Sequence, residues 1–228
     1  MKKLLFLLLC VPLIGLGQKP YCMSGNCNNG YGKYVWYTDG QTDMVPIIYD
    51  GQFKNGKFHG DGFIEVDYGN FEGGTSTSFI KGQWNNGRLD GNVIEIHIEE
   101  QYSTGEEYES DYEDIEFQDT YKYIGEYKDS LRNGFGIENS TALYYAHDIH
   151  LVGPMGSSHL NPIESVSTYI GQWQNDMRNG LGRYFYSNGD IYEGEWKDNK
   201  RHGRGLMIYN DGGMEEGLWE NGEFIGEK

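Results

Sequence analysis

The sequence predicts an all-β fold, an elongated and twisted single-layer antiparallel sheet made of tandem β-hairpins. A recurring pattern supports this: an aromatic residue, a spacer, glycine, a spacer, a second aromatic, a polar turn, and a lone glycine seven positions after the second aromatic. The clearest copies start at Tyr169 and Tyr192, 23 residues apart, a period typical of stacked structural repeats. Beyond the first twenty residues, no segment has the periodicity of an amphipathic helix.

The first strand of each unit follows from its aromatic and glycine positions. Because alternate residues of a strand point to the same face, positions one, three and five present two rings with a gap between them. Position one is occupied by Tyr49, Ile80, Tyr123, Tyr169, Tyr192 and Glu215. Position three is Gly51, Gly82, Gly125, Gly171, Gly194 and Gly217, and position five is Phe53, Trp84, Tyr127, Trp173, Trp196 and Trp219.

The turn and the second strand follow from positions seven to fourteen. Positions seven and eight, such as Asn55-Gly56, are residue types that accept positive φ, as a two-residue type I′ turn requires. Position twelve is glycine in every copy, and we expect it to lie opposite position three, with position fourteen opposite position one. Position eleven is His59 or His202 in two copies and Asp or Asn in others, so we interpret it as geometric rather than catalytic.

The first seventeen residues are typical of a signal peptide. Lys2 and Lys3 precede an apolar segment from Leu4 to Leu16, and Gly15 and Gly17 are the small residues that a signal peptidase requires. We therefore expect cleavage before Gln18 and an exported protein, periplasmic or secreted. Two cysteines remain, Cys22 and Cys27, and an even pair in an exported chain favours a disulfide over a redox or metal pair.

Residues 18–228 form the predicted repeat domain. Full copies start near residues 49, 80, 123, 169 and 192, and partial copies cover 21–40 and 215–226. Insertions at 41–48, 98–120 and 141–168 interrupt the array.

The pattern Tyr-x-Gly-x-Trp, a polar turn and His-Gly-x-Gly resembles the MORN (membrane occupation and recognition nexus) repeat family. Matching residues in two copies are Tyr192, Gly194, Trp196, His202, Gly203 and Gly205, and Tyr49, Gly51, Phe53, His59, Gly60 and Gly62. The segment CMSGNCNNGYGKYVWYTDG resembles the cysteine-bearing half repeat of exported bacterial members. The resemblance implies a groove-forming sheet used for protein or lipid interaction, usually without catalysis.

Composition and the insertions narrow the function classes. With 18 basic and 35 acidic residues, the chain has a net charge of −17 and is not expected to bind nucleic acid. Segment 98–120 forms either an extra hairpin or a calcium site, although it lacks an Asp-x-Asp-x-Asp-Gly loop. In the hairpin the turn lies near Ser103–Gly105 and the carboxylates are solvated, and the residues that line one face are Tyr102, Tyr108, Tyr112, Ile115 and Phe117. Segment 141–168 carries His147, His150 and His159 in either a surface loop or a zinc site. We expect no metal and no cofactor.

The leading functional hypothesis is a non-catalytic scaffold of the cell envelope that docks a protein or peptide partner. Its candidate contact residues form an exposed aromatic strip: Trp84, Tyr123, Tyr127, Tyr169, Trp173, Tyr192 and Trp196. Alternatively, these rings only pack between hairpins. Two further alternatives are binding of cell-wall glycan and binding of membrane lipid through Arg178, Arg183, Lys197, Lys200, Arg201 and Arg204. No phosphate-binding loop, nucleophile elbow or HExxH motif indicates an enzyme.

Overall fold

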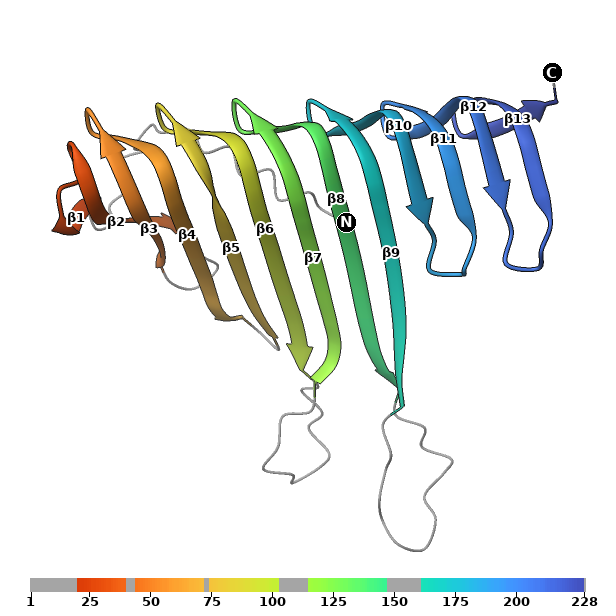
Figure 1. The fold of residues 1–228 in the computed structure, drawn as a ribbon. Coiled ribbons are helices and arrows are strands. Elements are labelled where there is room, and N and C mark those ends of the chain that lie inside the picture. The colour runs from red at the N-terminus through yellow and green to blue at the C-terminus, as the bar shows by residue number, and fades with distance from the viewer. Residues whose placement is uncertain (1–19, 40–43, 72–73, 103–114, 147–160, 228) are drawn as a thin grey trace, which may run out of the picture.

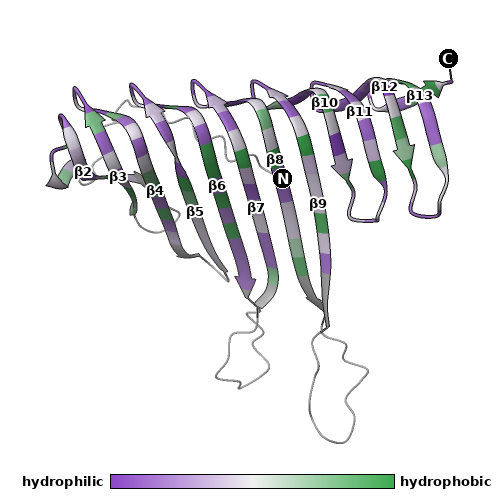
Figure 2. Cartoon of the chain, viewed as in Figure 1, coloured by the Kyte–Doolittle hydropathy of each residue, from purple (hydrophilic) through white to green (hydrophobic). Residues whose placement is uncertain are grey.

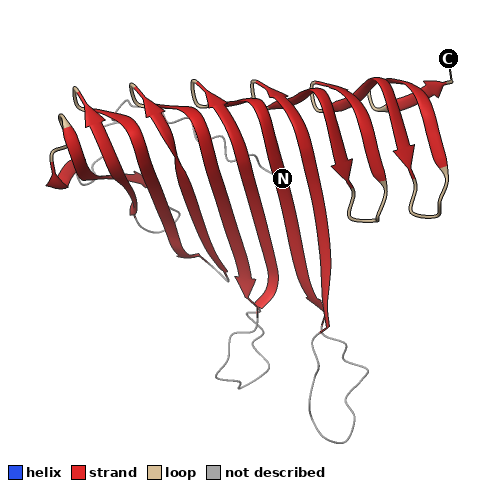
Figure 3. Cartoon of the chain, viewed as in Figure 1, coloured by secondary structure: helices blue, strands red, loops and turns tan. Residues whose placement is uncertain are grey.

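A computed structural model describes residues 20–39, 44–71, 74–102, 115–146 and 161–227. It confirms the predicted fold class: fourteen strands form one open antiparallel sheet in which each strand pairs with the next along the chain (Figure 1, Figure 3). Among these residues no helix is present that could cross a bilayer. The array is therefore a succession of hairpins, each held by its two neighbours in sequence.

Long central strands are flanked by shorter strands at both ends of the sheet (Figure 1). In chain order they are β1 (Tyr21–Gly25), β2 (Gly30–Asp39), β3 (Met44–Lys54), β4 (Lys57–Phe71), β5 (Gly74–Asn85), β6 (Arg88–Tyr102), β7 (Ile115–Lys128), β8 (Leu131–Ala146), β9 (Asn161–Gln174), β10 (Met177–Phe185), β11 (Ile191–Lys197), β12 (Lys200–Ile208), β13 (Met214–Glu220) and β14 (Glu223–Gly226). Strands β4 to β9 have 12 to 16 residues, whereas β10 to β14 have 4 to 9.

The two edges of the sheet carry different connections. At the upper edge in Figure 1, two-residue turns join the strands of each repeat, with φ of 52° at Asn55 and 71° at Gly56. These turn residues confirm the predicted type I′ geometry. The ribbons bend over near this edge, and successive tips are joined by backbone hydrogen bonds such as Asn199 N–H to the Arg178 carbonyl at 3.1 Å.

The predicted insertions lie at the opposite edge, where they lengthen strands. Ile98 pairs with Thr120 and Tyr102 with Ile115, so the ends of segment 98–120 extend β6 and β7. In the same way, residues 141–146 and 161–168 extend β8 and β9. The middle of each segment lies outside the described residues. These parts contain the predicted turn at 103–105, the remaining tyrosines of the acidic face and the three candidate zinc-binding histidines.

The register within each hairpin differs from the expected one. Position three pairs with position fourteen, as Gly194 does with Gly205, and position twelve pairs across to the next hairpin, as Gly203 does with Trp219. The expectations that position twelve lies opposite position three and position fourteen opposite position one are therefore wrong. A β-bulge follows Gly194 and moves the register of the outer part of the strand by two residues.

The bulge has a local cause at positions twelve and four. Gly203 has a φ of 57°, and an added Cβ would lie 2.5 Å from Cδ of Glu195. The Glu195 carboxylate accepts the Arg204 N–H at 2.9 Å, and Gln172 accepts the Leu181 N–H in the same way at 2.7 Å. Glycine at position twelve is required by this positive φ and by the side chain that lies over it.

Glycines at positions three and fourteen form a floor on which the tyrosine of position one lies. An added Cβ at Gly205 would lie 2.3 Å from the Tyr192 hydroxyl oxygen, so no other residue fits beneath this ring. In the second repeat both the tyrosine and the glycine beneath it are replaced. Position one is Ile80, position fourteen is Val93, and a Cβ on Gly82 would lie 2.7 Å from Cγ2 of Val93. The valine side chain occupies space that a tyrosine ring takes elsewhere.

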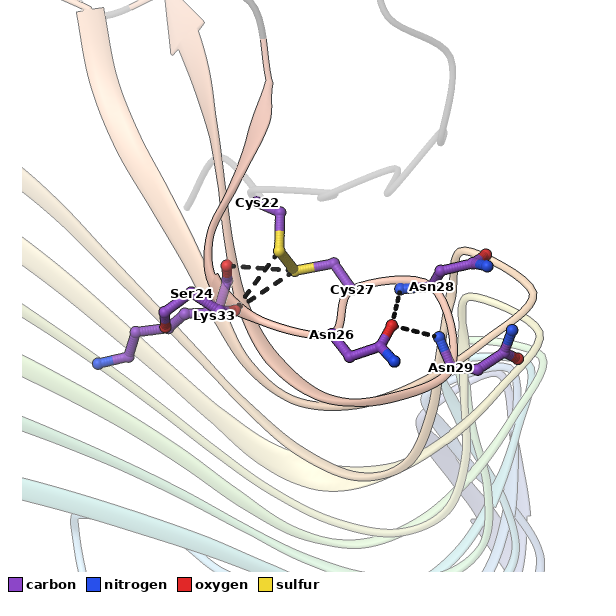
Figure 4. Close-up of a disulfide and its surroundings, with 7 residues drawn as sticks. All are labelled: Cys22, Ser24, Asn26, Cys27, Asn28, Asn29 and Lys33. Carbon is purple, nitrogen blue, oxygen red and sulfur yellow. Dashed lines mark hydrogen bonds between the residues drawn. A yellow bond between two sulfur atoms is a disulfide. The ribbon is translucent and has the colours of Figure 1, made fainter.

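The predicted disulfide between Cys22 and Cys27 is present (Figure 4). It joins β1 to the loop before β2, with the two Cα atoms 5.9 Å apart. The side-chain oxygen of Asn26 accepts the N–H groups of Asn28 at 3.1 Å and Asn29 at 2.9 Å, which fixes the same loop. The bond therefore ties down the N-terminal edge of the sheet.

Candidate functional site

The seven predicted contact residues all lie on one face of the sheet, which we call the ring face, and the structure buries them. Tyr123, Tyr169 and Tyr192 are 0 % exposed, and even the most accessible of the seven, Tyr127, is only 8 % exposed. The expectation of an exposed aromatic strip is therefore wrong. A direct contact between these rings and a partner stays a prediction, and it would require the side chains that cover the rings to move away.

The rings form a ladder from repeat to repeat, which is interrupted at the second repeat, where Ile80 stands in place of a tyrosine. Tyr169 meets Trp173 of its own repeat and Trp196 of the next edge-on, each with ring centroids 5.3 Å apart. Tyr192 repeats this geometry with Trp196 and Trp219. Such edge-to-face pairs contribute beyond the area that they bury, so the ladder joins neighbouring hairpins into one sheet.

Side chains at position ten cover the ladder. In the first full repeat, Phe58 stacks on Tyr49 with ring centroids 3.9 Å apart. In later repeats the cover is arginine: the Arg178 guanidinium carbon lies 4.9 Å from the Trp196 ring centre, and other arginines at this position lie over Tyr123 and Trp219. Arg178 and Arg201, two of the six predicted lipid-binding basic residues, are thus packed on rings by cation–π contacts.

Hydrogen bonds fix the tyrosines of the ladder further. The hydroxyl groups of Tyr49, Tyr169 and Tyr192 donate to position-four carbonyls at 2.9 to 3.0 Å. Burial raises the pKa of Tyr192 to about 12, so this hydroxyl stays protonated at neutral pH. The indole N–H of Trp196 donates to the Gly182 carbonyl at 3.2 Å. These rings are therefore components of the core.

A polar network on the ring face surrounds Arg132. Its guanidinium bonds the Glu95 carboxylate at 2.9 Å and the Glu138 carboxylate at 3.4 Å. The Tyr127 hydroxyl donates to Glu95 at 2.8 Å, and the Tyr121 hydroxyl donates to Glu138 at 3.2 Å. Burial raises the pKa of both tyrosines. Each carboxylate of the network therefore bonds both the Arg132 guanidinium and a tyrosine hydroxyl, and the formal charge of the cluster is about −1.

One further pair on this face resembles part of a hydrolase site. The Ser78 hydroxyl oxygen lies 2.7 Å from Nδ1 of His97. No carboxylate among the described residues hydrogen-bonds His97, so the pair does not form a triad with an orienting acid. No group of potential metal ligands gathers within the described ranges either.

The opposite face carries a feature that the sequence analysis missed. Four isoleucines pair directly in register across β6, β7, β8 and β9, and we call them the isoleucine row: Ile94, Ile124, Ile137 and Ile170. The first three are 41 %, 40 % and 36 % exposed, and Ile170 is half-buried. Figure 2 shows the hydrophobic and hydrophilic residues that alternate along these central strands.

The isoleucine row has a polar border on one side and further exposed apolar residues on the other. Lys122, Asn139 and Thr168 follow it along β7, β8 and β9 on one side, in register with one another. On the tight-turn side, Phe135 and Leu181 are strongly exposed, at 54 % and 63 %. Phe135 and Gln172 also line a shallow open hollow of about 380 Å³ between β8 and β9.

The signal for this row was present at positions two and fifteen. These positions are isoleucine only in the central copies, whereas position two is Asp50, Lys81, Glu193 and Glu216 elsewhere. The four isoleucines lie up to 33 residues apart in neighbouring strands, so only the register brings them together.

A model of the MORN repeat family matches residues 29–41, 49–63, 81–92, 123–140, 169–191 and 192–214. The chain is a MORN repeat protein. Five of its six MORN repeats coincide with hairpins of the sheet, the first lies on β2, and the hairpin of β13 and β14 follows the last of them. MORN repeat proteins are generally non-catalytic, and no catalytic family matches the chain. A comparison with curated proteins finds no match.

Proposed function

We propose that this MORN repeat protein is a non-catalytic scaffold of the cell envelope that docks a protein partner on the face opposite the rings. The observation that carries the proposal is the isoleucine row, which is exposed and has a border of polar residues along one side. Exposed apolar surface rimmed by polar residues is typical of protein interaction sites. The signal-peptide pattern of residues 1–17 supports the proposed location.

The two faces differ in what a partner can reach. Rings of the ladder are enclosed by position-ten side chains and hydrogen-bonded to the backbone, so a partner would have to displace the core. The isoleucines already contact solvent, and each Å² of apolar surface that a partner covers contributes about 25 cal/mol. Docking on the isoleucine row therefore leaves the fold unchanged.

Affinity capture from a cell-envelope extract tests the proposal. The chain is compared with the double variant Ile124→Thr/Ile137→Thr, and with the control Ser140→Ala/Ser167→Ala on the ring face of β8 and β9. A protein retained by the chain and the control is identified and then titrated against all three in purified form. We expect the isoleucine variant to bind it at least 10-fold more weakly.

Equal binding by all three proteins would contradict the proposal. So would capture of lipid or glycan alone, because these alternatives do not need the isoleucine row. Near-ultraviolet circular dichroism of each variant checks that the array is folded.

A further inference from the structure

We infer that the partner segment is an amphipathic helix with acidic flanks that lies across β6 to β9, with its apolar stripe on the isoleucine row. This inference rests on the proposed docking function and specifies the partner. Three properties of the row carry it: its direction, its width and the charges beside it.

The direction of the row favours a helix. Neighbouring strands lie about 4.8 Å apart, so a segment that crosses them meets one isoleucine at each such step. A helix has a pitch of about 5.4 Å and presents about one apolar residue per turn along a stripe, which nearly matches that step. An extended peptide repeats the same face about every 6.8 Å and would fall out of step after two strands.

The polar border along one side of the row disfavours a broad apolar partner. One residue further along the same face, β7, β8 and β9 carry Lys122, Asn139 and Thr168 in place of isoleucine. On this side the apolar surface is therefore about one side chain wide over β7 to β9, whereas Ile96 on β6 and Phe135 on the other side of β8 widen it locally. A helix with a single narrow stripe fits this shape, whereas a second flat sheet would bury the polar border.

The charges beside the row favour acidic flanks. Lys81 pairs in register with Ile94 at one end, and Lys122 borders the row on β7. Both lysines are exposed, and neither forms an ion pair within the part of the chain that the structure describes. In a chain with 35 acidic and 18 basic residues, two unpaired lysines beside an apolar stripe favour an acidic partner.

The other two charged side chains beside the row, Arg183 and Glu126, each already have a bonding partner within the chain. Arg183, which pairs with Ile170 at the far end, bonds the carboxylate of Glu193. On the tight-turn side, the Glu126 carboxylate accepts the Phe135 N–H at 3.1 Å. The lysines therefore set the orientation of the helix: its acidic flank faces the border that contains Lys122, and its basic or neutral flank faces Glu126.

Two labelled helical peptides test the inference by fluorescence anisotropy. Both carry leucine once per turn, and their flanks are glutamate in one peptide and lysine in the other. We expect the glutamate peptide to bind the chain at least 10-fold more tightly. Lys81→Glu/Lys122→Glu should reverse this preference, Ile124→Thr/Ile137→Thr should weaken both peptides, and the tip control Lys197→Glu/Lys200→Glu should leave the preference unchanged.

Several results would overturn the inference. They are equal binding of both peptides and absence of binding by either peptide. A third is that the tip control loses the preference for the glutamate peptide as the Lys81→Glu/Lys122→Glu variant does, which would indicate a nonspecific charge effect. A dimer in sedimentation that Ile124→Thr/Ile137→Thr dissociates would also overturn it, because a second copy would then cover the row. If the captured partner still requires the isoleucines while neither peptide binds, the helix is excluded and the docking function stands.

Discussion

The two faces of the central strands use the same backbone for different purposes. On the ring face, Tyr123 and Tyr169 are fully buried, hydrogen-bonded and covered by position-ten side chains. On the other face of the same strands, Ile124 and Ile137 pair in register and remain about 40 % and 36 % exposed. The ring face builds the array from repeat to repeat, and the isoleucine face is left for a partner.

The comparison shows that apolar character alone does not locate a binding surface. A single-layer sheet has no second layer to cover it, so the rings supply most of its buried apolar surface. Each isoleucine side chain has a smaller surface area than a ring, yet the isoleucines are the apolar side chains that a partner can reach. Cover, rather than side-chain type, separates the assembly face from the display face.

The largest expected effect on the free energy of unfolding comes from removing a ring of the ring face. Tyr169→Ala removes a fully buried ring with edge-on contacts to two tryptophans, so we expect a loss of about 3–5 kcal/mol in the free energy of unfolding. Ile137→Thr keeps a β-branched side chain at a part-exposed site and should cost about 1 kcal/mol or less. Urea unfolding followed by tryptophan fluorescence measures both, and similar losses would contradict the assignment of the two faces.

A smaller effect comes from the second repeat, where Ile80 and Val93 replace the usual tyrosine and glycine. Val93→Gly alone leaves a cavity, and Ile80→Tyr alone brings a ring onto the valine, so each should cost about 1–3 kcal/mol. The double variant restores the arrangement of the other repeats. A double-mutant cycle in urea should give a favourable coupling of at least about 1 kcal/mol, and additive losses would show that ring and floor are independent.

Alkaline pH should weaken the ring face selectively. The pKa of Tyr192 is about 12 in the folded chain, above the value of about 10 for an unfolded tyrosine. Its stabilising contribution is therefore complete below pH 10 and is lost as the pH rises through about 12. Urea midpoints measured from pH 9 to pH 11.5 should fall, and Tyr192→Phe should fall less steeply over the same interval. An identical slope in the variant would exclude this residue as a source.

The smallest effect belongs to the lysines beside the isoleucine row. Lys122→Ala removes an exposed cation without an ion-pair partner among the described residues, so the free energy of unfolding should change by about 0.5 kcal/mol or less. Urea unfolding of the variant checks this. A loss above about 1.5 kcal/mol would mean that the lysine supports the sheet and is not available to a partner.

The hairpins, their turns and the disulfide were predictable because each depends on residues close in sequence. Asn55-Gly56 indicates its turn directly, and Cys22 and Cys27 lie five residues apart. The register was not, because it depends on how Glu195 lies over Gly203 and moves the strand by a bulge. Neither alternation nor composition says which face of a single sheet is covered.

The candidate surface was missed for a related reason. Ile94 and Ile137 are adjacent to Ile124 only through pairing with β6 and β8, which sequence periodicity along one strand does not reveal. The prediction of an exposed ring strip failed because the cover comes from position ten, where Phe58 and Arg178 look unrelated in sequence. Both residues cover rings, one by stacking and the other by a cation–π contact.

The most direct test of the two-face account places a photo-crosslinking amino acid on either face of β8 in the presence of the captured partner. Positions 137 and 140 lie three residues apart on this strand and point to opposite faces, the first in the isoleucine row and the second beside Tyr121. The account predicts a covalent adduct with the partner from position 137 and none from position 140. An adduct from position 140 alone would place the partner on the ring face and contradict the account.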